Sequence, residues 1–325
     1  MGVPRPLRWS TLTNPVVVVG QIARDIALRI DEVPTAGHGV DVAERRELLG
    51  GKGANIAVGL VQLGVPVTLI GVLGDDLAGD CLSGQCVRDG VPTEAIIHRA
   101  ETASALMLDV VTADGRWRYL ESVPNGALLT ADDIRAQAAV IVQASTVVVQ
   151  LQQPADALSA VVGLTGPGCR IILDGATPSD ETVRHELLRS ATVLRCDARE
   201  AELIAGRPVP DVETARDVAH QLMEAGPELV VLAVGEEGDL AVWPGGEMLV
   251  PLIDAPVVDT TGGGDAFVAA LTWALTQGSG PAQAVQLATA AAGLTVRQLA
   301  GRPALTPERV RAEAERVGSL PGRAR

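Results

Sequence analysis

Residues 259–267 read Asp-Thr-Thr-Gly-Gly-Gly-Asp-Ala-Phe and lead into an apolar, alanine-rich stretch that continues to about residue 276. Three consecutive glycines let the backbone approach an anion closely, because no Cβ atom intervenes and successive N–H groups can point the same way. The start of a helix adds partial positive charge at the same place. Gly262, Gly263 and Gly264 are therefore predicted to form an anion hole for a phosphoryl group in transfer.

Asp265 follows these glycines directly, at the mouth of the predicted anion hole. A carboxylate repels phosphate, so its presence there favours a chemical role. The role that fits is removal of the proton from an attacking hydroxyl, which contributes roughly 10²–10⁴ in rate. The alternative is a glycine-rich turn in which Asp265 only caps the helix.

A second glycine-rich segment, residues 50–55, reads Gly-Gly-Lys-Gly-Ala-Asn and also precedes a helical pattern. Its spacing matches neither the Walker A motif nor G-x-G-x-x-G. Gly51, Lys52 and Asn55 can present a backbone N–H, an ammonium and an amide to a polyhydroxyl ligand. The alternative is a tight turn that needs positive φ angles.

Short apolar runs alternate with helical patterns along most of the chain. The runs lack polar alternation, which is typical of strands buried on both faces of a parallel sheet. They are residues 16–19, 67–72, 147–151, 171–173, 193–194 and 229–234. The helical patterns are residues 56–63, a start at 130–133, and residues 211–225, 266–276 and 282–299. This alternation predicts an α/β fold with a doubly wound, mostly parallel sheet flanked by helices.

Two stretches interrupt the alternation, at about residues 35–49 and 103–122, and read as exposed strands. We expect them to form a small β-sheet lid over the carboxyl ends of the main strands. The prediction is one domain over residues 14–318, with loose tails at 1–13 and 319–325.

The second of these strands carries Arg116, Trp117, Arg118 and Tyr119. Side chains alternate along a strand, so the two aromatic rings share one face and the two arginines the other. The aromatic face suits a sugar or a nucleobase. The alternatives are a solvated lid and a dimer contact.

The composition limits the classes of ligand. The 325 residues are 47% hydrophobic, enough for a large core, and the formal net charge is −14. An acidic surface disfavours nucleic acid and membrane as partners, and a bound polyphosphate would need local positive charge. The four cysteines read as reduced thiols, and the first residues have no apolar signal-peptide core. We therefore expect a cytoplasmic protein.

The two glycine-rich signatures, in this order and at this separation, resemble those of the ribokinase-like (PfkB) sugar kinases. The likeness covers nearly the whole chain. Gly-Gln-Ile-Ala-Arg-Asp at 20–25 resembles the family's first-strand motif. Gly-Asp-Asp at 74–76, followed by Gly79, resembles the turn that follows the family's third strand. Asp-Ala-Arg-Glu at 197–200 lies where the family has Asn-x-x-Glu, and Gly-x-x-Gly at 235–238 matches its nucleotide-side loop. The resemblance implies ATP, Mg²⁺, a monovalent cation such as K⁺, and a homodimer formed through the lid.

The resemblance also implies roles for individual residues. Asp265 is the catalytic base, and Gly262, Gly263 and Gly264 form the anion hole. Asp25, Gly51, Lys52, Asn55 and Gln152 bind the substrate, while Asp197, Glu200, Gly235, Gly238 and Thr289 surround the nucleotide. Glu200 orders Mg²⁺ through water, and Asp259 and Thr261 hold the monovalent cation with backbone carbonyls from near Ala300. Without the resemblance, Asp25 has two interpretations. It can accept hydrogen bonds from two adjacent hydroxyls of a ligand, or it can be an aspartate in a surface loop.

Three residues depart from the ribokinase pattern: Ala23 and Asp197, where asparagine is usual, and Gln152, where glutamate is usual. Changed sugar contacts alter substrate preference, so three functions remain open. The first is a kinase of an unphosphorylated sugar such as ribose. The second is a nucleoside or pseudouridine kinase, with room beside Ala23 and aromatic stacking on the lid. The third is a catalytically weak sugar- and nucleotide-binding regulator.

Overall fold

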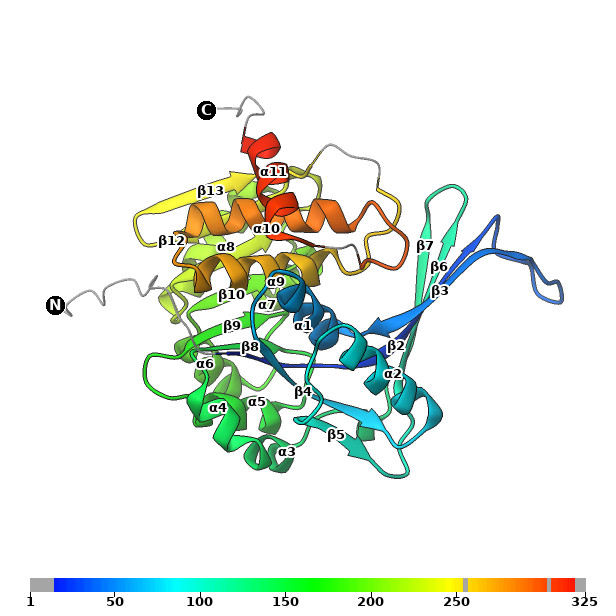
Figure 1. The fold of residues 1–325 in the computed structure, drawn as a ribbon. Helices are drawn as coiled ribbons and strands as arrows, with labels where there is room; N and C mark the ends of the chain where they lie inside the picture. Colours follow the sequence, from blue (N-terminus) through cyan, green and yellow to red (C-terminus); the bar gives the residue numbers. More distant parts are fainter. Residues whose placement is uncertain (1–14, 254–256, 303–304, 319–325) are drawn as a thin grey trace.

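The computed structural model describes residues 15–253, 257–302 and 305–318 of the chain; both predicted tails lie outside them. Within these residues the fold is a nine-stranded sheet covered by helices on both faces, with a separate four-stranded sheet at one side (Figure 1). The strand order of the large sheet is β13-β12-β11-β10-β9-β8-β1-β4-β5. Its strands are β1 (Val16–Val19), β4 (Val67–Gly74), β5 (Ile96–Arg99), β8 (Thr146–Gln150), β9 (Arg170–Asp174), β10 (Val193–Cys196), β11 (Leu229–Ala233), β12 (Asp239–Trp243) and β13 (Gly246–Val250).

The central strand β1 shows why the apolar runs form this sheet. It pairs in parallel with β4 on one side and β8 on the other, and all four valines are buried. Val16 and Val18 pack into one hydrophobic core, and Val17 and Val19 into the core on the opposite face. Helices must therefore cover both faces, as predicted.

The helices divide into two layers. One layer packs on the core that contains Val16 and Val18; its helices are α1 (Lys52–Gln62), α2 (Leu77–Arg88), α9 (Gly263–Thr276), α10 (Pro281–Thr295) and α11 (Pro307–Gly318). The other layer comprises α3 (Ala131–Ala136), α4 (Ala138–Gln143), α5 (Ala155–Leu164), α6 (Glu181–Ser190), α7 (Ala198–Ala205) and α8 (Val212–Glu224). No helix in the described part of the chain is long and apolar enough to cross a membrane.

The small sheet has the order β3-β2-β6-β7 and stands beside the large sheet, on the side toward which β4 points (Figure 1). Its strands are β2 (Ala23–Ile30), β3 (Val42–Gly50), β6 (Ala105–Thr112) and β7 (Trp117–Ser122). The two predicted segments supply β3, β6 and β7. The strand β2 was not predicted, because its polar and apolar residues do not alternate regularly, and it enters the sheet by pairing with β3 and β6.

Two further predictions need correction. The helix expected over 282–299 ends at Thr295, because the chain turns back: the Val296 carbonyl accepts the backbone N–H groups of residues 258 and 259. The large sheet also includes β5 and the antiparallel pair β12 and β13, which the apolar runs did not indicate. The edge strands β5 and β13 are only partly buried, and β12, although buried, is five residues long and begins with an aspartate, so none of the three leaves a strong apolar pattern.

Candidate active site

The polar residues of the predicted site follow neighbouring strands at one edge of the large sheet. Gln152 follows β8, Asp174 ends β9, Asp197 follows β10, and Gly235 follows β11. These strands are adjacent and parallel, so their carboxyl ends meet at the same edge, where α/β proteins usually bind ligands.

The glycine-rich turn places Asp265 at the start of α9. Gly262 has φ +71° at the N-cap, and a Cβ atom there would lie 2.5 Å from the carbonyl oxygen of Gly301. Only glycine fits this crowded, left-handed position. Asp265 falls in the first helical turn and is buried.

The two signature segments meet at this point. The side-chain amide of Asn55, in α1, donates a hydrogen bond of 2.8 Å from Nδ2 to Oδ2 of Asp265. Burial raises the pKa of Asp265 to about 6, with Asp174 adding to the shift and Lys52 and Arg195 opposing it. A carboxylate with this pKa is ionised at neutral pH and can still accept a proton.

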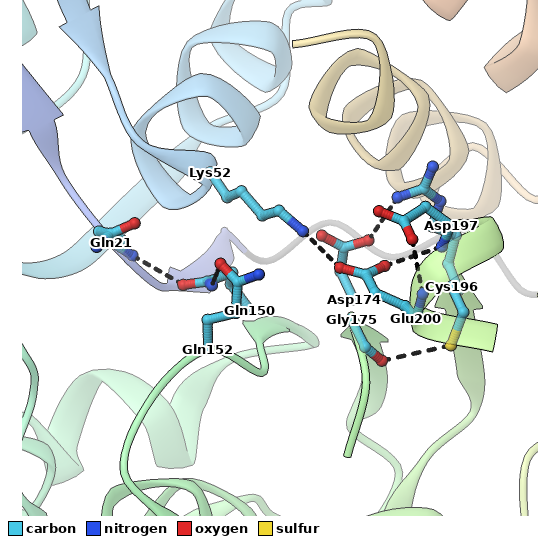
Figure 2. Close-up of polar contacts among 10 residues, drawn as sticks. Gln21, Lys52, Gln150, Gln152, Asp174, Gly175, Cys196, Asp197 and Glu200 are labelled. Carbon is cyan, nitrogen blue, oxygen red and sulfur yellow. Dashed lines mark hydrogen bonds and ion pairs between the residues drawn. The ribbon is translucent and has the colours of Figure 1, made fainter. Parts of the chain in front are cut away.

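The Lys52 side chain extends from the Gly50–Asn55 segment toward Glu200 (Figure 2). Its Nζ donates to Oε1 of Glu200 at 2.7 Å, and Glu200 forms a reciprocal capping box with Asp197, with both bonds at 2.8 Å. Burial disfavours the charged ammonium, but Asp174, Glu200 and Asp265 together raise the pKa of Lys52 above its usual value. Lys52 therefore provides a fixed positive charge between the carboxylates.

Asp25 lies against Gly50, at the start of the second signature. Its carboxylate occupies the space that a Cβ atom on Gly50 would need, and Oδ1 is buried without a hydrogen-bond partner. Burial raises the pKa of Asp25 to about 8, and the nearby Asp109 and Asp265 add to this shift. An unsatisfied buried carboxylate of this kind is suited to hydroxyl groups of a ligand.

Gln152 lies next to two other glutamines, Gln21 and Gln150 (Figure 2). Gln150 accepts the backbone N–H of Gln21 at 3.2 Å and donates to Oε1 of Gln152 at 3.0 Å. With its oxygen engaged, Gln152 presents its amide NH₂ group as a donor. The pocket therefore has a donor where a glutamate would present only acceptors.

A cavity of about 720 Å³ connects these residues, which is the usual size for a small-molecule site. Its walls combine residues from both signatures, from residues 195–203 and from the small sheet. The residues that line the cavity include Asp25, Lys52, Asn55, Met107, Asp109, Trp117, Tyr119, Glu121, Gln152, Arg195, Asp197, Glu200, Thr261, Gly262, Gly264 and Asp265. As the alternation predicted, Trp117 and Tyr119 share the face toward this cavity.

The sequence reasoning did not find Arg195 and Asp174. Both are buried, and Arg195 Nη1 lies 3.2 Å from Asp174 Oδ1. The guanidinium stacks over the ring of Phe267 at 5.6 Å, and a Cβ atom on Gly264 would come within 2.9 Å of Nη1. Arg195 therefore places a positive charge beside the predicted anion hole. The available signal was an arginine inside an otherwise apolar run, two residues before Asp197.

The carboxylate of Asp259 braces the glycine-rich turn. It accepts the backbone N–H of Thr261 and that of Ala300, each at 2.9 Å. Ala300 and Gly301 both have positive φ angles, so the chain makes a left-handed turn against residue 261. Each Asp259 oxygen keeps a lone pair, and oxygen donors from this turn suit a monovalent cation.

The fit of Mg²⁺ can be judged from the nucleotide-side carboxylates. The described residues contain no group of three or more His, Cys, Asp or Glu side chains that could enclose a metal ion. Asp174 Oδ2 is, however, buried without a hydrogen-bond partner next to Glu200 (Figure 2). An orphaned carboxylate oxygen beside a second carboxylate fits a Mg²⁺ ion that keeps most of its waters and binds through nucleotide phosphates.

Five predicted residues do not line this cavity: Asp259, Gly263, Gly235, Gly238 and Thr289. Gly235 and Gly238 flank the short turn η2 (Gly235–Glu237) with φ angles of +50° and +120°, at the end of β11. Thr289 is buried in α10 and donates to Oδ2 of Asp239 at 2.9 Å. Its side chain therefore braces β12 from the interior of the fold.

Ala23 does not provide the extra room that the sequence suggested. It is fully buried and packs with Ala105, Met107 and Ala127 under the small sheet, outside the cavity wall. Its partners fill the volume that a longer side chain would occupy, so a larger substrate cannot be inferred from this position.

Known proteins with the same architecture include ribokinases. A ribokinase of Mus musculus is 27% identical over 263 residues, which cover 80% of this chain and 81% of the relative. The structure of a Thermotoga maritima ribokinase superposes with a TM-score of 0.78 at 23% identity, covering 93% of this chain and all of the other. Arabidopsis thaliana ribokinase, solved with ribose and ATP, gives a TM-score of 0.76 at 24% identity, covering 95% of this chain and all of the other.

The family assignment rests on a longer match. Residues 13–308 match the sequence model of the pfkB family carbohydrate kinases, which includes both glycine-rich signatures and the strands between them. The fold, with its large mostly parallel sheet and small separate sheet, agrees with this match. The chain therefore belongs to the pfkB family of carbohydrate kinases.

Proposed function

We propose that this kinase transfers the γ-phosphoryl group of ATP to a hydroxyl of a small unphosphorylated sugar bound between Asp25 and Asp265. The observation that carries this proposal is the 2.8 Å hydrogen bond that fixes Asp265 against Asn55. It holds a buried, ionisable carboxylate at the start of α9, next to the glycines that can receive the phosphoryl group.

In the proposed reaction, the substrate hydroxyl gives its proton to Asp265 while its oxygen bonds to the γ-phosphorus. The bond from that phosphorus to the bridging oxygen breaks, and ADP leaves with the electron pair. Backbone N–H groups of Gly262, Gly263 and Gly264 and the charge of Arg195 stabilise the phosphoryl oxygens. Asn55 holds the carboxylate in position.

The remaining residues hold the two substrates. Asp25, Gly51, Lys52 and Gln152 bind sugar hydroxyls. The nucleotide lies over Asp197, Glu200, Gly235 and Gly238, with Thr289 supporting that region through Asp239. Glu200 would hold Mg²⁺ through waters, and the ion would supply positive charge to offset that of the phosphates. Asp259 and Thr261, with carbonyls near Ala300, hold a monovalent cation such as K⁺ at the back of the glycine-rich turn.

The relatives named ribokinase make ribose the first candidate substrate. A nucleoside is the second candidate, because Trp117 and Tyr119 line the cavity and could stack on a base. A coupled assay of ADP release over pentoses, hexoses and nucleosides distinguishes them. Turnover of a sugar is expected; turnover of nucleosides alone would favour the second candidate, and no turnover with ligand binding would favour a regulator.

We also propose a homodimer through the small sheet. In strand β7 of this sheet, the large apolar residue Leu120 is 55% exposed to solvent. Exposed apolar side chains favour contact with a second copy of the chain. Light scattering of the purified protein should give twice the chain mass, and Leu120→Glu should reduce it toward the mass of one chain.

The pH dependence of turnover is expected to follow Asp265. The base must be ionised, and its pKa in the free enzyme is about 6, so kcat/KM should fall about tenfold per pH unit below that value and level off above it. Lys52 and Arg195 lower the pKa of Asp265, Asp174 raises it, and the Asp25 carboxyl group also interacts with it. Lys52→Met should therefore move the midpoint of the kcat/KM–pH profile upward. A midpoint below pH 5 in the wild type, or a downward shift in this variant, would contradict the assignment.

A further inference from the structure

Asp109 is a buried carboxylate in the cavity that the proposed reaction does not use. It lies in β6 opposite Ala27 of β2 and Tyr119 of β7. Because side chains on adjacent strands share a face when they are paired, Asp109 projects from the same face of the small sheet as Tyr119. Both residues contribute to the cavity wall.

The carboxylate of Asp109 lacks a partner within the described residues. It is 3% exposed, no described group donates a hydrogen bond to it, and no basic side chain offsets its charge. Burial, followed by the nearby carboxylate of Asp259, raises its pKa to about 6. A buried acid in this state is costly to the free protein, so a compensating group from a ligand is the natural explanation.

The surroundings indicate which ligand group would compensate it. Asp25 and Glu121 add two more carboxylates to the same wall, while Arg116 and Arg118 belong to the opposite face by alternation. Trp117 and Tyr119 present aromatic rings beside the acid. A carboxylate flanked by aromatic rings is the combination that binds an ammonium group, through a charge-assisted hydrogen bond and cation–π attraction.

We propose that Asp109 is a specificity-determining residue that binds a protonated amino group, so that the substrate is an amino sugar or a similar aminated polyol. This inference rests on the proposed kinase function and names the substrate class of the same site. A sugar phosphate or a sugar acid would meet the carboxylates of Asp109 and Glu121 on this wall and be repelled.

The test compares matched substrate pairs that differ only in the amino group: glucosamine with glucose, galactosamine with galactose, and mannosamine with mannose. We expect wild-type kcat/KM to be at least about tenfold higher for the amino member of the best pair, since one charge-assisted contact supplies a difference of this order. Asp109→Asn should abolish this preference while changing kcat/KM for the neutral member about threefold or less.

The control variant is Asp114→Asn, which removes one negative charge from the tip of the same small sheet, where Asp114 pairs with Arg116 at 2.6 Å. It should keep the preference for the amino sugar. Thermal unfolding checks the fold: Asp109→Asn removes an unpaired buried acid, so its midpoint should equal or exceed that of the wild type.

The results separate this inference from the proposed function. Turnover of neutral sugars as good as that of their amino counterparts, or a preference unchanged by Asp109→Asn, would overturn the role of Asp109 and leave the sugar kinase standing. If no sugar is turned over, the proposed function fails. In that case, calorimetric titration with the same pairs tests the role of Asp109 without turnover. Binding of an amino sugar that is lost in Asp109→Asn supports this role, and equal binding of both members of each pair overturns it.

Discussion

Asp265→Asn is expected to lower kcat by roughly 10²–10⁴ while leaving the affinities for sugar and ATP nearly unchanged. The amide has the size and shape of the carboxylate and can still accept the hydrogen bond from Asn55. It cannot take a proton from the substrate hydroxyl. The loss should therefore appear in kcat and not in binding, as measured by steady-state ADP release together with calorimetric titration.

A matched control for this variant is Glu313→Gln, another buried carboxylate, in α11, which pairs with Arg297 at 2.5 Å. Glu313 lies outside the cavity wall, so its substitution should change kcat about twofold or less. A kcat of Asp265→Asn close to that of the wild type would remove the catalytic base from the proposal. Such a result, with sugar and ATP still bound, would favour the hypothesis that the protein is a sugar- and nucleotide-binding regulator.

Arg195→Met is the second substitution with a large expected effect. Removing one positive charge from an anion-stabilising site typically lowers kcat by about 10²–10³. The same change leaves Asp174 buried without its ion-pair partner, which is expected to cost about 3–5 kcal/mol in the free energy of unfolding. Stability and catalysis must therefore be separated.

The double variant Asp174→Asn/Arg195→Met separates them. It removes both charges of the buried pair, so it should regain most of the stability that Arg195→Met loses, measured by urea unfolding. Its kcat should stay low, because the charge beside Gly264 is still missing. Arg195→Lys, which keeps the charge, should be less impaired. Recovery of kcat along with stability would show that Arg195 acts only through folding.

The fold and the centre of the candidate site could be predicted from the sequence because both depend on local patterns of residues. Runs such as Val16–Val19 have no polar side to expose, so they specify strands buried on both faces. The glycines at positions 262–264, 50, 51 and 53 are required by backbone geometry, since close approach and left-handed turns exclude side chains. Asp265 and Asn55 each follow such a turn, and for that reason both could be assigned before their contact was seen.

The tertiary structure alone decided which charges share the cavity and which remain unpaired. Arg195 and Asp174 lie 21 residues apart on neighbouring strands, and Asp109 meets Asp25 only because β2 joins the small sheet beside β6. Burial and electrostatic interaction depend on groups that are distant in the chain, and no local pattern encodes them. The sequence by itself therefore determined the fold and the position of Asp265, the proposed base, while long-range packing determined the charge around it.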